Sequence, residues 1–163
     1  MAPTVERKRV FIDTSVLFAA VLSATGGSRL ILKLGEAGVL RLVVSRQVLR
    51  EADGVLRQKA PDAVALFGLL LDQAGVQIGR PAPRAQVEEL RERVGHPGDA
   101  RIVADAMRAK VDYLVTLDKK HLLGNTALSR HLSFPVGTSG DLLALLRHQL
   151  GTLGHGSGDV QLR

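Results

Sequence analysis

Residues 10–20 read VFIDTSVLFAA, an apolar run that stops at the carboxylate of Asp13 and then resumes. Val10 to Ile12 form a short β-branched and aromatic run, which is typical of a buried strand. The apolar residues after Ser15 predict a helix, so Asp13 stands at a strand-to-helix turn. An Asp at such a turn can simply cap the helix, because its oxygen accepts a free backbone N–H group. A metal ligand at the end of a strand would look the same, and other carboxylates must decide.

The rest of the chain alternates between short strands and helices. Apolar runs predict strands at 8–12, 41–44, 113–116 and 134–136, with a short edge strand in the turn-rich connector GVQIGRPAP. Helical spacing of apolar residues predicts helices between the strands at 8–12, 41–44 and 113–116, with Ser28 capping the second of them, and a last helix at 141–150. A polar stretch precedes the strand at 134–136. Such alternation indicates βαβ units with right-handed crossovers. We therefore expect an α/β fold with three layers, α/β/α, around a mostly parallel central sheet of four to five strands.

Length and composition point to one domain. The chain has 163 residues, of which 45% are hydrophobic but only 3% aromatic, so the core must consist of Leu, Val, Ile and Ala. We expect a single domain over residues 1–150. The final segment, GTLGHGSGDVQLR, has little apolar periodicity, and we expect residues 151–163 to be a disordered tail.

The charge and the cysteine count limit the possible functions. Lys and Arg number 22 against 16 acids, giving a net charge of +6, and a basic surface attracts polyanions such as nucleic acid. The absence of cysteine excludes disulfides, thiolate metal sites and thiol nucleophiles. No apolar run approaches the roughly 18 residues that span a bilayer, and no signal-peptide core follows the N-terminus. We expect a soluble, cytoplasmic protein without a membrane partner.

Two further carboxylates fall where Asp13 falls. Asp118 follows the strand at 113–116, and ligands of parallel sheets bind outside the carboxyl ends of the strands. Asp99 lies within the apolar stripe of its helix, where a charge costs several kcal/mol unless a group such as a metal ion compensates it. Asp105 lies at the edge of that stripe, and we expect it to flank the site or support a ligand from behind. The three positions favour a metal site over independent caps.

A fourth acid is ambiguous on helical geometry alone. On the helix that Ser45 opens, Glu51 and Asp53 lie about equally far from the apolar centre, on opposite sides. Either could be an ordinary solvated residue.

Four motifs in order resemble the PIN-domain family, which includes the ribonuclease toxins of bacterial toxin–antitoxin pairs. They are VFIDTSVL, VVSRQVLREADGVL, GDARIVADAM and VDYLVTLDKKHLL, and the similarity extends from Val10 to Leu146. The family's spacing from Ser to Glu selects Glu51 over Asp53. Two departures are visible: Ser15 stands where the family usually has Asn, and Lys119 stands where many relatives have a further acid. The second departure leaves occupancy of a second metal site open.

The resemblance implies a metal-dependent ribonuclease that hydrolyses RNA phosphodiester bonds as the toxin of such a pair. Carboxylates without cysteine suit Mg²⁺ or Mn²⁺. Asp13 would be the central ligand, Asp99 and Asp118 would complete the main site, and Glu51 would hold a second ion or orient water. The implied partners are an RNA substrate, a protein antitoxin and a second copy of the chain in a homodimer.

Other polar residues have supporting roles in this interpretation. Ser15 and Thr116 suit hydrogen bonds that orient the ligating carboxylates, although capping and strand-end roles are equally open to them. Lys119 would contact a substrate phosphate. His96 and His121 are left outside the site, because a lone His near a turn is usually neither a base nor a ligand.

Two other classes of function compete with the nuclease. A PIN module that binds nucleic acid or regulates without turnover would keep the basic surface but gain nothing from clustered acids. A phospho-acceptor receiver or a haloacid-dehalogenase-type phosphatase also places Asp after a first strand, but the chain lacks the paired acids that these need. Gly26-Gly27 lacks the Lys-Ser/Thr ending of a phosphate-binding loop. We favour the nuclease.

Overall fold

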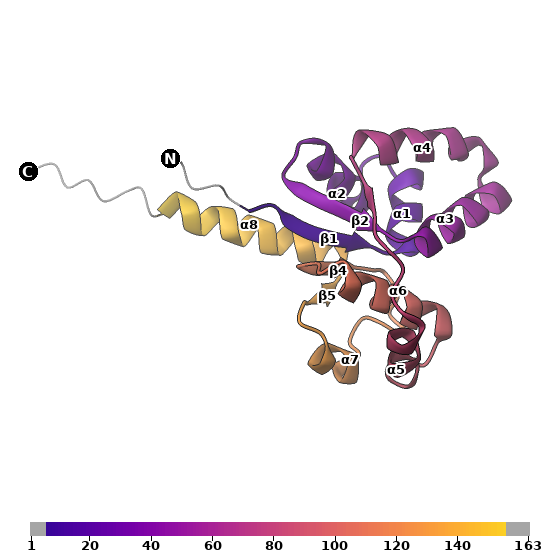
Figure 1. Ribbon diagram of the computed structural model, residues 1–163. Helices are drawn as coiled ribbons and strands as arrows, with labels where there is room; N and C mark the ends of the chain where they lie inside the picture. Colours follow the sequence, from indigo (N-terminus) through magenta and orange to yellow (C-terminus); the bar gives the residue numbers. More distant parts are fainter. Residues whose placement is uncertain (1–5, 156–163) are drawn as a thin grey trace, which may run out of the picture.

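The computed structural model describes residues 6–155, whose strands form one central sheet (Figure 1). The strands are β1 (Lys8–Ile12), β2 (Leu40–Val44), β3 (Gln77–Ile78), β4 (Tyr113–Val115) and β5 (Val136–Gly137). Every pairing is parallel, and the order across the sheet is β3-β2-β1-β4-β5. The predicted α/β class with a mostly parallel sheet of four to five strands is confirmed. The strand order reverses between β1 and β4, and the crevice at such a reversal is where open α/β sheets bind ligands.

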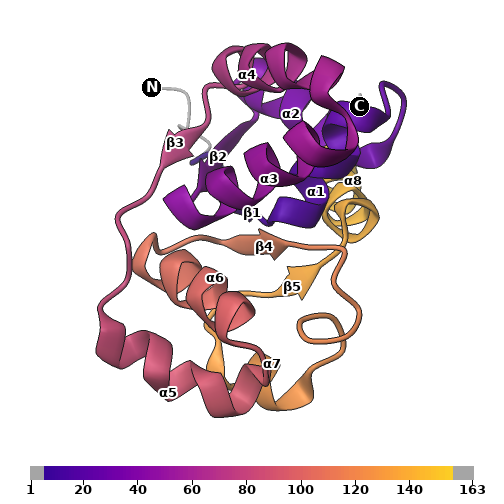
Figure 2. The ribbon, with the colours of Figure 1, turned by 90° about the vertical axis from the view of Figure 1, so that its right-hand side faces the viewer.

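Helices cover both faces of this sheet, as the view in Figure 2 shows. Helices α1 (Thr14–Leu22), α2 (Gly27–Glu36), α3 (Arg46–Lys59) and α4 (Val64–Gln73) lie on one side, with the short 3₁₀ turn Pro61–Ala63 leading into α4. Helices α5 (Arg84–Val94), α6 (Pro97–Arg108) and α7 (Thr126–His131) lie on the other. Helix α8 (Ser139–His155) packs against α2, β4 and β5. The three predicted layers are therefore present.

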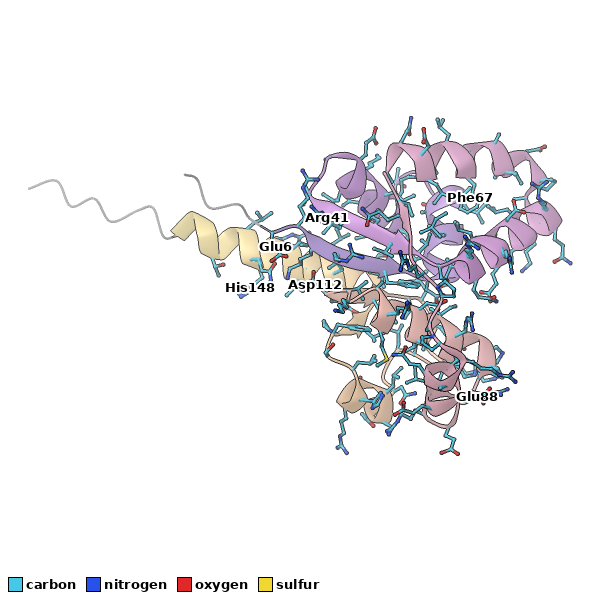
Figure 3. The ribbon with its side chains drawn as sticks, in the orientation of Figure 1. Glu6, Arg41, Phe67, Glu88, Asp112 and His148 are labelled. Atoms are coloured by element: carbon cyan, nitrogen blue, oxygen red, sulfur yellow. The ribbon has the colours of Figure 1, made fainter. Side chains whose placement is uncertain are left out.

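The buried residues form one cluster around the sheet. The ends of β1 and β2 are buried on both faces, as the β-branched runs of the sequence predict. Phe67 of α4 adds a buried aromatic side chain to the core (Figure 3). Glu6, Arg41 and Asp112, which lie at the starts of β1, β2 and β4, mark the amino edge of the sheet (Figure 3). The opposite, carboxyl edge carries the predicted acids.

Three predictions of local structure differ from the observed elements. Helix α7 was not predicted; Asn125 caps it by accepting a hydrogen bond from the backbone N–H of Leu128. Ser28 does not cap α2, because Gly26 takes that position and the buried Ser28 hydroxyl pairs with that of Ser139 at 3.0 Å. Helix α8 continues to His155, through the first part of the segment expected to be a tail. A glycine such as Gly151 costs a helix only about 1 kcal/mol, which explains the continuation.

The remainder of the expected tail, residues 156–163, lies outside the described residues. Within residues 6–155, no single helix is long and apolar enough to cross a membrane. Helices α1 and α2 meet the length and composition criterion only together, as a pair bent by 95°.

Candidate functional site

Asp13 lies at the carboxyl end of β1 beside β4, where the strand order reverses. Its backbone N–H donates to the carbonyl of Val115 at 3.1 Å, which extends the pairing of the two strands by one residue. Its side chain caps α1, because Oδ1 accepts the N–H of Thr14 at 2.7 Å. The cap uses only one carboxylate oxygen, so capping does not account for the whole side chain.

The second oxygen of Asp13 is held by two hydroxyl groups. Thr116 Oγ1 donates to Oδ2 at 2.6 Å, and Ser15 Oγ donates to it at 3.1 Å. Each hydroxyl also accepts a backbone N–H from the segment after β4: Thr116 from Asp118 at 3.0 Å, and Ser15 from Leu117 at 3.0 Å. The two hydroxyls therefore tie the carboxylate of β1 to the loop that carries Asp118. Ser15 makes here the type of contact expected when it replaces the usual Asn.

A glycine of the edge strand helps to place Thr116. The Thr116 N–H donates to the carbonyl of Gly137 in β5 at 3.0 Å. A β-carbon at Gly137 would collide with the hydroxyl of Tyr113, so glycine at this position leaves room for the Tyr113 side chain beside β5.

Glu51 reaches the same edge from α3. Its Oε2 accepts the hydroxyl of Thr14 at 2.8 Å, and its Oε1 accepts the amide of Gln47 at 2.6 Å. Asp53, the alternative on this helix, points away and forms an exposed ion pair with Arg57 at 2.8 Å. The structure therefore places Glu51, and not Asp53, beside Asp13.

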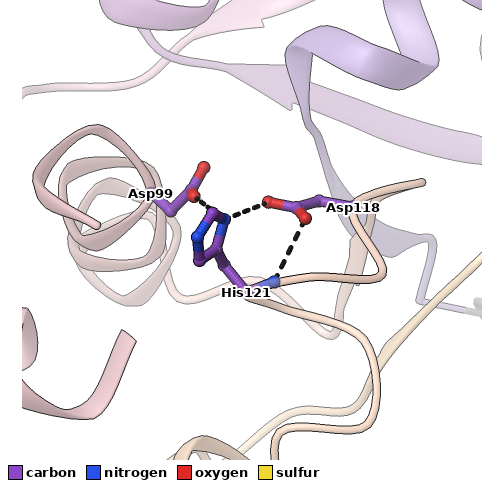
Figure 4. Close-up of side chains that lie close together, drawn as sticks. All are labelled: Asp99, Asp118 and His121. Atoms are coloured by element: carbon purple, nitrogen blue, oxygen red, sulfur yellow. Dashed lines mark hydrogen bonds and ion pairs between the residues drawn. The ribbon is translucent and has the colours of Figure 1, made fainter. Parts of the chain in front are cut away.

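Asp99, Asp118 and His121 form the most compact group at this edge (Figure 4). One potential ligand atom from each residue lies within 4.8 Å of the others, and this is the one such group among residues 6–155. His121 Nδ1 lies 3.0 Å from Asp99 Oδ2 and 3.3 Å from Asp118 Oδ2. The imidazole thus stands between two carboxylates.

The turn after β4 orients this group. Asp118 Oδ1 accepts the backbone N–H groups of Lys120 at 2.9 Å and His121 at 3.1 Å, which folds the chain back so that the imidazole faces the carboxylate. Across the crevice, α6 starts at Pro97 after the left-handed Gly95 ends α5, and this places Asp99 in its first turn. His96 caps α6 by accepting the N–H of Asp99 at 3.4 Å.

Burial and mutual repulsion perturb the acids. Burial raises the pKa of Asp13 despite the hydrogen bonds from Thr116 and Thr14. Burial, together with the charge of Asp118, raises the pKa of Asp99 to about 6. Burial acts against ionisation of Asp118 as well, but the N–H groups and the imidazole of the turn hold its pKa below the usual value. Two neighbouring carboxylates with opposite shifts are characteristic of a site that binds cations or transfers protons.

The expected site residues converge to different degrees. Asp99 and Asp118 come together with His121, which the sequence interpretation left out. Asp13 and Glu51 lie at the same edge but outside that group of ligand atoms, and hydroxyls and an amide donate hydrogen bonds to their oxygens. A signal for His121 exists in the sequence: an Asp followed three residues later by a His is compatible with a turn in which the two side chains meet.

Comparison with known proteins places this geometry in a family. The family model described as the PIN domain matches residues 9–120. The chain belongs to the PIN-domain family. PIN domains are generally nucleases and typically use divalent metals. The acids of this chain gather where the strand order reverses between β1 and β4, a position suited to a divalent metal. No curated protein matches the chain.

Three solved structures are similar to the chain at low sequence identity. PAE2754 from Pyrobaculum aerophilum is 17% identical, with a TM-score of 0.59 over 86% of this chain and 96% of that chain. VapBC2 from Rickettsia felis, solved with a DNA fragment from its promoter, is 15% identical, with a TM-score of 0.59 over 78% and 96%. VapC20 from Mycobacterium tuberculosis, described as a toxin that cleaves the sarcin-ricin loop, is 16% identical, with a TM-score of 0.49 over 68% and 91%.

The donor set fits a divalent cation. Asp99 and Asp118 offer the carboxylate oxygens that Mg²⁺ and Mn²⁺ prefer, and His121 adds a nitrogen that suits softer divalent ions. Asp99 is partly exposed, with 17% of its side chain accessible, so the group is open to ligands from solvent.

Proposed function

We propose that this PIN domain is a metal-dependent endoribonuclease that uses Mg²⁺ or Mn²⁺. The observation that carries the proposal is the group of Asp99, Asp118 and His121 at the carboxyl edge, in a chain of a nuclease family. The carboxylate of Asp13, which accepts hydrogen bonds from Thr116 and Thr14, lies at the same edge.

Each acid has a role in this proposal. A bound divalent ion would make water a better nucleophile and stabilise charge on the phosphoryl and leaving oxygens. Asp99 and Asp118 supply ligand oxygens. Asp13 supplies a third, oriented by Ser15 and Thr116 in the way that residues behind a metal ligand commonly act.

Two residues complete the assignment. Glu51, held by Thr14 and Gln47, orients the attacking water or binds a second ion. Lys119 is exposed directly after Asp118 and contacts a substrate phosphate.

The decisive experiment compares RNA cleavage by the unmodified protein and by Asp13→Asn. We expect cleavage with Mg²⁺ or Mn²⁺, none with a chelator, and none with Asp13→Asn in either condition. Asn caps a helix about as well as Asp, so the variant should remain folded, which its melting curve checks. Full activity of Asp13→Asn, or cleavage by rigorously metal-free protein, would contradict the mechanism. An inactive unmodified protein that still binds RNA would favour a regulatory PIN module instead.

We further propose that the enzyme is the toxin of a toxin–antitoxin pair and acts in the cytoplasm. The fold shared with VapBC2 motivates this proposal, since that structure is of a two-component complex. A basic side chain of an antitoxin would pair with the acids of the site, and a homodimer is the expected form of the toxin. Expression of the chain alone should then arrest growth, and coexpression with the adjacent gene should restore it. Equal toxicity of Asp13→Asn would rule out cleavage as the cause.

A further inference from the structure

A groove of about 500 Å³ opens beside the carboxylates, between the first turns of α3 and α6. Three arginines line it: Arg46 and Arg50 from α3, and Arg101 from α6. We call it the arginine groove. Arg46 and Arg50 are four residues apart, so they project from one face of the helix about 6 Å apart along its axis.

Most of the positive charge in the arginine groove is not neutralised by the protein. Arg46 and Arg50 are exposed, and neither side chain has a hydrogen bond or ion pair with any residue in 6–155. Arg101 Nε lies 3.8 Å from Asp105 Oδ2, a long contact with the only acid among the described residues that line the groove. By contrast, the exposed Arg57 lies on the same helix as Arg46 but pairs with its neighbour Asp53 at 2.8 Å. Two guanidinium groups are therefore available to a ligand.

The arginine groove shares a border with the carboxylate site. Gln47 lines the groove and donates its amide to Glu51 Oε1 at 2.6 Å. Gly98 also lines the groove and directly precedes Asp99; a β-carbon there would lie 3.9 Å from Glu51 Oε1. A chain that follows the groove therefore continues directly to the acids.

The acids themselves repel a phosphate, so the affinity for a polyanion must come from neighbouring positive charge. Guanidinium groups bind phosphate oxygens through paired N–H donors. The first turns of α3 and α6 add the positive ends of two helix dipoles to the same groove. The groove thus supplies the positive field that the site beside it lacks.

We propose that the arginine groove binds the phosphodiester backbone of single-stranded RNA on one side of the bond that is cleaved. This inference rests on the proposed nuclease function and adds the path of the substrate to it. Arg46 and Arg50 contact successive phosphates, and Arg101 contacts the strand deeper in the groove. The contacts are to the backbone, so they contribute affinity rather than sequence preference.

The test measures binding of a single-stranded RNA oligonucleotide by fluorescence anisotropy, over a range of salt concentrations. The Asp13→Asn protein with Mg²⁺ serves as the background, so that the RNA stays intact. In Arg46→Ala/Arg50→Ala we expect Kd to rise about tenfold and the magnitude of the slope of log K against log salt to fall by about 1.4, since each of the two lost contacts to a single strand contributes ~0.7. The Lys pair, Arg46→Lys/Arg50→Lys, should keep most of the slope because it keeps both charges.

The matched control removes the same charge from the amino edge of the sheet. Arg41 is the second residue of β2 (Figure 3), and Arg147 lies in α8 beside the starts of β1 and β2. Because salt screens charges that lie at the opposite edge from the groove, we expect Arg41→Ala/Arg147→Ala to change Kd less than about twofold. Equal losses in the groove and control variants would overturn the groove assignment, as would a groove variant that binds RNA normally. Melting curves show whether Arg46→Ala/Arg50→Ala is folded; if it is not, Arg46→Gln/Arg50→Gln replaces it.

Cleavage separates this inference from the proposed function. RNA cleavage by unmodified protein, with unchanged binding in the groove variant, would leave the nuclease intact and reject the groove. Binding that depends on the groove, without any cleavage by unmodified protein, would support the groove and reject the nuclease.

Discussion

Two aspartates of α6, Asp99 and Asp105, are six residues apart and differ in what holds them. Asp105 is 2% exposed; its Oδ1 accepts the backbone N–H of Ala82 at 2.7 Å, and the side chain of Ser45 also hydrogen-bonds to it. Among residues 6–155, Asp99 finds only the imidazoles of His96 and His121 as side-chain partners. The same type of side chain on one helix is thus bound by fixed donors at one end and contacted by two imidazoles at the other.

Burial raises the pKa of both acids, but only Asp99 also has its pKa raised by the charges of neighbouring carboxylates. For Asp105, the N–H of Ala82 and the charge of Arg101 counteract burial. For Asp99, the charge of Asp118 adds to burial, and its pKa reaches about 6. A carboxylate that faces another carboxylate is costly to the fold, and a bound cation or a shared proton offsets that cost. We therefore assign Asp105 to the fold and Asp99 to the site.

The largest expected difference between Asp105 and Asp99 is in the free energy of unfolding. Asp105→Ala leaves the N–H of Ala82 buried without an acceptor, so we expect it to destabilise the protein by about 1–3 kcal/mol. Asp105→Asn keeps an acceptor for that N–H and should cost less. Asp99→Ala removes no such acceptor and should not destabilise the metal-free protein. Chemical denaturation of the three variants provides the measurement. A larger loss in Asp99→Ala than in Asp105→Ala would reverse our assignment.

The contrast also shows what the sequence could predict. The places of Asp13 and Asp118 follow from strands that end in parallel, and the apolar stripe of α6 indicated that Asp99 faces inward. The full burial of Asp105 could not be predicted, because its partner Ala82 belongs to a connector 23 residues away that has no periodic pattern. Local sequence patterns predict helices, strands and the residues at their ends. The contacts that irregular segments make can be seen only in the folded structure.

Two other residues illustrate the same limit. The helical wheel could not separate Glu51 from Asp53; the hydroxyl of Thr14, on another element, identifies the one that faces the site. His121 was left out because its role depends on a turn closed by the side chain of Asp118, and a single His carries no periodic signal.

Two histidines provide a second, smaller test. His121 lies between the two acids, whereas His96 is half exposed and caps α6. We expect His121→Asn to weaken Mn²⁺ binding about tenfold, at the low end of losses for residues that tune a metal site. His96→Asn keeps a good capping residue and should change binding little. Titration calorimetry measures both. Tighter Mn²⁺ binding by His121→Asn would mean that the imidazole competes with the ion rather than binding it.

The last test concerns how the stability of the metal-free protein depends on pH. The pKa of Asp99 in the folded state, about 6, lies above its ordinary value of 3.8. The folded state therefore binds this proton more tightly than the unfolded state, and the stability that the proton contributes is lost as pH rises through 6. The amide that Asp99→Asn introduces cannot ionise, so at pH 7.5 with a chelator we expect this variant to be more stable than the unmodified protein. The pKa shift alone would correspond to about 3 kcal/mol, and solvent screening of the partly exposed Asp99 reduces this to roughly 1–2 kcal/mol. The advantage should shrink as the pH falls toward 4. Added Mg²⁺ should reverse the order at pH 7.5, because it binds the folded unmodified protein and not the variant. Melting temperatures of both proteins at pH 7.5 and pH 4, with and without Mg²⁺, test this prediction. If Asp99→Asn is less stable than the unmodified protein at pH 7.5 without metal, Asp99 supports the fold as Asp105 does.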